Sequence, residues 1–109
     1  MRIAATSTGT TVDSAVDPKF GRCQHFLFID TDGSGVEHLS NPYRSASTGT
    51  GPRCAQLLVD RHVEVLLSGD VGPKARRALE AAGIRVVTGC SGTVAEAVAE
   101  LLAPPRQPT

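Results

Sequence analysis

The sequence predicts an α/β domain with a mixed five-stranded sheet, an antiparallel hairpin at one edge and three flanking helices. In the second half of the chain, short apolar segments alternate with amphipathic ones, which is typical of parallel strands joined through helices. In the first half, the turn sequence TDGSG at 31–35 separates two strand-like segments, which favours a hairpin. The length of 109 residues suits a single domain, which we place at 1–103, followed by a flexible tail at 104–109.

Three strands are expected in the first half of the chain. The segment 2–6 is a short apolar strand, and 25–30 (HFLFID) has apolar side chains on both faces, so both faces should be covered. The segment 36–40 returns antiparallel after the turn. A loop rich in Thr, Ser, Gly and Asp occupies 7–22. Loops of this length are uncommon in small domains, and the length favours a functional role for this one.

Helices and strands alternate in the second half. Gly51 and Pro52 suit the cap and first position of a helix, and Thr93 with Glu96 can form a capping box. Gly83 is placed to end the middle helix. The expected helices start at Pro52, Pro73 and Val94, and the expected strands between them span 63–68 and 84–88.

Charge and hydropathy exclude several classes of partner. Eleven basic and eleven acidic residues cancel, so the chain lacks the positive charge that binds nucleic acid or an anionic membrane. The N-terminus MRIAAT has no signal-peptide pattern, and no apolar segment approaches the length that spans a bilayer. We therefore expect a cytoplasmic protein with no nucleic-acid or membrane partner.

Three cysteines, Cys23, Cys54 and Cys90, are expected at one end of the sheet. Take the strand at 2–6 as running upward. Cys23 then precedes a strand that runs downward, Cys54 lies in the first turn of a helix that runs downward, and Cys90 follows a strand that runs upward. All three then lie at the carboxyl ends of the parallel strands, where open α/β sheets place ligands. Three thiols would suit an iron-sulfur cluster or another thiophilic metal site. Each cysteine taken singly is also a common type of buried core residue.

Several neighbouring groups would support an anionic species at this end. Arg22 and Arg53 each adjoin a cysteine, and helix N-termini favour negative charge. His25 is a further candidate to complete the ligand set, although strand alternation can turn it away from Cys23 and a structural role suits it as well. The glycine-rich STGTGP at 47–52 can cradle an anion or simply begin a helix, and it lacks the Lys-Ser/Thr of a phosphate-binding loop.

The chain resembles the dinitrogenase iron-molybdenum cofactor family over about residues 2–102. The resemblance lies in the opening IAATS, the block VDPKFGRCQHFLFID, the Asn-Pro after the hairpin, GTGPRCAQLL, VEVLLSGDVGPKARRALEAAGIRV and TGCSGTVAEAV. It implies a ribonuclease H-like fold. Members include nitrogenase cofactor carriers, which typically have histidine where this chain has Lys19, and orange proteins, which hold a molybdenum-copper sulfide cluster.

These observations together predict a carrier or scaffold, not an enzyme, that holds an iron-sulfur or molybdenum-containing metal-sulfur cluster for assembly or transfer. Its expected metal ligands are Cys23, Cys54 and Cys90, with Arg22, Arg53 and His25 also in contact with the cofactor. The expected partners are the cluster and a protein that donates or receives it, and an open coordination position would also suit a homodimer. The alternatives are a cysteine-based redox protein and a regulatory module without a bound cluster.

Overall fold

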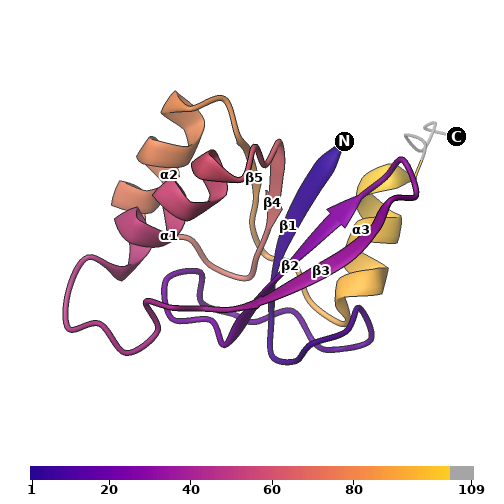
Figure 1. Ribbon diagram of the computed structural model, residues 1–109, viewed down its shortest axis with the longest axis horizontal. Coiled ribbons are helices and arrows are strands. Elements are labelled where there is room, and N and C mark those ends of the chain that lie inside the picture. The colour runs from indigo at the N-terminus through magenta and orange to yellow at the C-terminus, as the bar shows by residue number, and fades with distance from the viewer. Residues whose placement is uncertain (104–109) are drawn as a thin grey trace, which may run out of the picture.

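The computed structural model describes residues 1–103 and shows one five-stranded sheet with helices on both faces (Figure 1). The expected tail at 104–109 lies outside the described residues. In chain order the elements are β1 (Arg2–Ser7), β2 (His25–Asp30), β3 (Gly35–Ser40), α1 (Thr50–Asp60), β4 (Val65–Leu67), α2 (Pro73–Ala81), β5 (Arg85–Val87) and α3 (Val94–Leu102).

The strand order β3-β2-β1-β4-β5 places the hairpin at one edge of the sheet. Strands β1, β4 and β5 are parallel, whereas β2 pairs antiparallel with both β1 and β3. The predicted mixed sheet, edge hairpin and three helices are therefore confirmed. We call the end at which β1, β4 and β5 finish the loop end, which lies at the bottom of Figure 1.

The sheet separates two apolar clusters, because successive side chains of a strand point to opposite faces. Phe26 and Phe28 of β2 pack with α1 and α2 on one face, which we call the α1/α2 face. Leu27 of β2 packs with Val94 and Ala97 of α3 on the other, the α3 face. In Figure 1, α1 and α2 accordingly lie together on one side of the sheet and α3 on the other.

Two predicted helix starts have different outcomes. Helix α1 begins at Thr50 and not at Pro52, because Gly49 adopts a left-handed φ of 71° and serves as the N-cap. Pro52 remains within the first turn, where its missing N–H has no helical partner to lose. The capping box of α3 is confirmed: the Thr93 side chain accepts from the backbone N–H of Glu96, and the Glu96 carboxylate accepts from that of Thr93.

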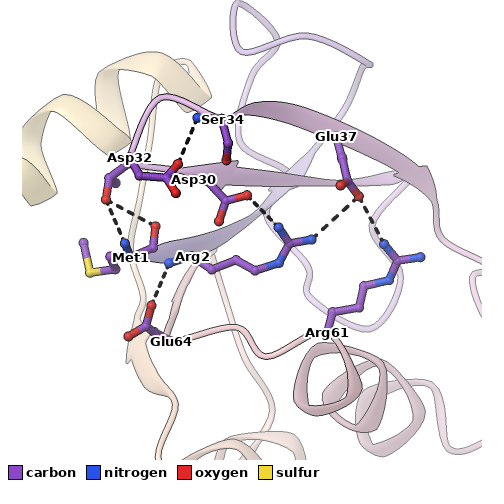
Figure 2. A network of polar contacts seen from close by, with 9 residues as sticks. Met1, Arg2, Asp30, Asp32, Ser34, Glu37, Arg61 and Glu64 are labelled. Carbon is purple, nitrogen blue, oxygen red and sulfur yellow. Dashed lines mark hydrogen bonds and ion pairs between the residues drawn. The ribbon is translucent and has the colours of Figure 1, made fainter.

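A polar network secures the end of the sheet opposite the loop end. Figure 2 shows the Arg2 guanidinium between two carboxylates, with Nη1 at 2.8 Å from Asp30 and Nη2 at 3.7 Å from Glu37. Arg61, just after α1, reaches the same Glu37 at 3.6 Å. Both guanidinium groups also lie over the ring of Phe28, at 5.2 and 4.9 Å from its centroid. The network thus ties β1, β2, β3 and the end of α1 together.

Within residues 1–103, no helix is both long and apolar enough to cross a bilayer.

Candidate functional site

The long loop before β2 is held firmly against the loop end. The buried carboxylate of Asp17 accepts hydrogen bonds from the backbone N–H groups of Lys19 and Gln24, at 3.1 and 3.2 Å. Pro18 lies so close to Gly69 that a Cβ atom added to Gly69 would be 2.5 Å from the Cα of Pro18. Only glycine permits that contact at Gly69, so the loop and the β4–α2 connection form one packed unit.

A cavity of about 460 Å³ opens beside this unit. Its walls come from three segments that are distant in sequence: the loop at 19–22, the start of α1 at 50–52, and the segment 70–75 at the start of α2. We call it the α1/α2 pocket. Lys19, Arg22 and Lys74 line it together with one acidic residue, Asp70, so positive charge prevails.

Among the described residues, no side chain neutralises the positive ends of the two helices that begin at the α1/α2 pocket. Neither α1 nor α2 has a side-chain hydrogen bond at its N-cap or an acidic residue in its first turn. The N-terminus of α3 differs, because Thr93 and Glu96 already satisfy it. Unpaired N–H groups and the positive end of the helix dipole favour an anion. Of the three helix starts expected to favour an anion, the structure thus leaves those of α1 and α2 free to do so.

Two of the predicted thiols come together just beneath this pocket. Cys23 and Cys54 are fully buried on the α1/α2 face, and both contact the side chain of Asn41. The Nδ2 group of Asn41 lies 3.7 Å from Cys23 Sγ, and its Oδ1 accepts from Cys54 Sγ at 3.5 Å. Cys54 Sγ also lies 3.8 Å from the carbonyl oxygen of Gly21, a residue of the pocket wall.

Burial keeps both of these sulfurs protonated. It raises the pKa of the Cys54 thiol to about 11, although the Asn41 hydrogen bond acts in the opposite direction. Burial raises the pKa of Cys23 still further, and the nearby Cys54 and Asp17 add to that increase. Both groups are therefore neutral thiols near pH 7, and a metal ion would have to displace a proton to bind either of them.

Cys90 lies at the same end of the sheet but on its other face. It follows β5 and packs against the α3 cluster, while Cys23 and Cys54 belong to the cluster of α1 and α2. Its Sγ is 3.7 Å from the carbonyl oxygen of Val87, and burial raises the pKa of its thiol. Among residues 1–103, no three His, Cys, Asp or Glu side chains gather closely enough to hold one metal ion. The three-thiol ligand set stays a prediction.

The three other predicted contact residues occupy different surroundings. Arg22 lines the α1/α2 pocket, and its Nη1 donates to the carbonyl oxygens of Arg44 and Ala46 at 2.9 and 2.8 Å. Arg53 is exposed, with its guanidinium 5.9 Å from the ring centroid of Tyr43. The ring of His25 pairs with that of His38 in β3. Burial lowers the pKa of His25, and the nearby charges of His38 and Arg44 lower it further.

Sequence reasoning missed two residues of this site. In the sequence, Asn41 stands out only through the proline that follows it, yet its side chain joins both thiols to the backbone of the loop end. Lys74 has no part in the site predicted from the sequence, but it lines the α1/α2 pocket. The sequence signals were an asparagine directly after a strand and a lysine next to a helix-opening proline, and both are common outside functional sites.

Comparisons with known proteins agree with this fold. The structure superposes on the apo form of the orange protein from Desulfovibrio gigas with a TM-score of 0.88 and 42% identity, covering 93% of this chain and 86% of that one. A putative NifB protein from Thermotoga, described as belonging to the DUF35 family, gives a TM-score of 0.78 and 38% identity over 92% of this chain and 85% of that one.

A relative from another organism and a family model also match this chain in sequence. An uncharacterized protein of Methanocaldococcus jannaschii is 24% identical over 89 residues, which cover 79% of this chain and 75% of that protein. The model of the family described as dinitrogenase iron-molybdenum cofactor matches residues 1–103. The match spans every element of the sheet and all three helices, and the predicted resemblance is confirmed. The chain therefore belongs to the dinitrogenase iron-molybdenum cofactor family.

Proposed function

We propose that this protein carries an anionic metal-sulfur cluster as cargo, of the iron-sulfur or molybdenum-containing class, and passes it to a partner protein. The observation that carries the proposal is the α1/α2 pocket, where three cationic side chains and two helix N-termini without side-chain caps line one cavity. Membership of a family described by a nitrogenase cofactor supports the same class of cargo. The protein's part would be binding and release without catalysis.

The charges at the pocket would hold an anion by electrostatic attraction, without a set of buried ligands that encloses it. Lys19 and Lys74 are exposed at the rim, and each can approach a bound anion on a flexible stem. Arg22 is less free because two carbonyl oxygens already hold its guanidinium. Surface charges of this kind attract a ligand while remaining solvated, which suits cargo that must leave again.

Thiolate ligation is a further element of the proposal. Cys54 Sγ is 3.8 Å from the carbonyl oxygen of Gly21 in the pocket wall, and Cys23 lies alongside through Asn41. Both sulfurs are fully buried, so thiolate ligation would require the loop at 19–24 to move away from α1. Cys90 would join them as a third ligand only through a larger rearrangement, since the sheet stands between the two clusters.

Anaerobic titration with tetrathiomolybdate, followed by visible absorption, tests the proposal. Lys74→Glu should weaken binding by about tenfold or more, since reversing a charge a few ångströms from a dianion costs about 1–2 kcal/mol at a solvated surface. Arg77→Glu, on the same helix but outside the pocket lining, is the matched control and should bind nearly as well as the unmodified protein. Equal losses in both variants, or no binding at all, would contradict the pocket as the cargo site.

Reconstitution with ferrous iron and sulfide separates the two modes of binding. If the cysteines are ligands, a thiolate-to-metal absorption band should appear and vanish in Cys23→Ser and Cys54→Ser, with Cys90→Ser reporting on the third thiol. Cargo held by charge alone would show only its own sulfide-to-metal absorption, unchanged in all three cysteine variants and lost in Lys74→Glu.

Thiol redox chemistry is the second candidate function, and the contact of both Cys23 and Cys54 with one asparagine side chain favours it. A mild two-electron thiol oxidant would then join the two sulfurs, with loss of both thiol protons. Peptide mapping by mass spectrometry after such treatment should find a Cys23–Cys54 disulfide, and oxidation of Cys90 alone would exclude this candidate.

A further inference from the structure

Two histidines form a close pair on the hairpin, away from the α1/α2 pocket. His25 Nδ1 and His38 Nε2 lie 2.8 Å apart, and the ring centroids are separated by 4.7 Å. His25 begins β2, and His38 lies in β3 opposite Leu27, so the two rings are diagonal neighbours across the antiparallel pair. They stand on the face that carries Leu27, whereas Cys23 belongs to the cluster on the opposite face.

This pair is open to solvent. His38 is exposed and His25 is half-buried, so an ion from solution can reach the facing nitrogens without unfolding the strand. The strand backbones hold the rings at a set register, because β2 and β3 pair continuously from His25↔Ser40 to Asp30↔Gly35. Two imidazoles fixed in this way lose little conformational freedom when they bind a common ligand.

The separation of the two nitrogens matches the bite of a metal ion. Metal–nitrogen bonds of about 2.0–2.1 Å at angles between about 90° and 110° place adjacent ligand nitrogens roughly 2.9–3.4 Å apart. The observed 2.8 Å is slightly shorter because one nitrogen donates a hydrogen bond to the other. To turn both lone pairs from each other toward one ion, each ring would have to reorient by roughly 35–45°, which the solvent-open position of the pair allows.

We propose that His25 and His38 together bind a divalent late transition metal ion, such as Ni²⁺, Cu²⁺ or Zn²⁺, with solvent completing its coordination. Imidazole suits these metals. In the free pair one facing nitrogen carries a proton, and binding transfers that proton through solvent to the outer nitrogen of the same ring. The charge of Arg44 acts on His25, so binding depends on metal–nitrogen bonding more than on Coulomb attraction.

The test adds NiCl₂ to the full chain in the absence of cargo. Ni²⁺ is chosen because it does not oxidise thiols as Cu²⁺ does. Paramagnetic broadening in ¹H–¹⁵N NMR spectra should centre on β2 and β3 around the two histidines. His25→Gln and His38→Gln should each weaken Ni²⁺ binding about tenfold or more, because one of two metal–nitrogen bonds is lost. His62→Gln, at the third and exposed histidine, is the matched control and should bind like the unmodified protein.

Every variant changes a solvent-accessible side chain, and the dispersion of the same spectra verifies that it folds. Broadening that is unchanged in His25→Gln and His38→Gln, or centred on the cysteines, would overturn the proposal. Absence of broadening at millimolar NiCl₂ would overturn it as well. None of these results bears on cargo binding at the α1/α2 pocket, which tetrathiomolybdate reports separately.

Discussion

Replacing Asn41 with alanine is expected to loosen the loop end, because this one side chain ties together three segments. Its Nδ2 group donates to the carbonyl oxygens of Cys23 and Gly21, at 3.0 and 3.2 Å. Its Oδ1 accepts from the backbone N–H of Tyr43 at 2.9 Å and also from the Cys54 thiol. Asn41 is only 8% exposed, so water cannot fully replace these partners.

The expected cost follows from the three backbone hydrogen bonds. Each contributes about 1 kcal/mol net, so Asn41→Ala should lower the free energy of unfolding by about 3 kcal/mol. The two sulfur contacts, at 3.5 and 3.7 Å, are weaker and add little. For a domain of this size the midpoint of thermal unfolding should fall by roughly 12 °C.

Urea unfolding followed by circular dichroism measures this difference directly. Ser47→Ala, an exposed position in the same connection between β3 and α1, is the control and should change stability by less than about 0.5 kcal/mol. Alkylation of Cys54 by iodoacetamide should also become faster in Asn41→Ala, because the segments that cover its sulfur are no longer tied together.

A loss below about 1 kcal/mol, with an unchanged dependence on urea concentration, would refute this reasoning. Asn41 would then be satisfied equally well by water in the unfolded chain, and the contacts around the two thiols would not stabilise the loop end.

Three further predictions concern other parts of the fold. Gly69→Ala should lose about 1–3 kcal/mol because its Cβ would collide with Pro18, whereas Gly72→Ala meets no atom within 4 Å and should change stability little; equal unfolding midpoints would contradict this packing. Burial raises the pKa of Cys54 to about 11, so the folded state favours the protonated thiol. The contribution of this thiol to the free energy of unfolding should be fully present below about pH 9 and decline as the pH rises toward 11. In Cys54→Ala the alkaline decline, measured by urea unfolding at several pH values, should be smaller, and an identical decline would assign it to other groups. Thr93→Ala should cost about 1 kcal/mol through loss of the α3 capping box, while Thr88→Ala, an exposed threonine ahead of that helix, should be neutral in the same assay.

Local sequence patterns were sufficient for the elements, their order along the chain and the place of the hairpin at one edge of a mixed sheet. The turn TDGSG specified the hairpin, and the start and stop signals around Pro73, Gly83 and Thr93 marked the last two helices. The same patterns placed Cys23, Cys54 and Cys90 at the loop end, since the direction of each strand follows from its order and connections. These are properties of neighbouring residues and of chain direction, which a sequence records.

The face of the sheet on which each thiol lies was not encoded locally. Packing of α1 and α2 on one face and α3 on the other separates Cys90 from Cys23 and Cys54. The link through Asn41 and the meeting of Lys19 with Lys74 at one pocket also join residues distant along the chain. Such contacts depend on how whole helices cover the sheet, and so they emerge only when the apolar faces of all the elements are buried together.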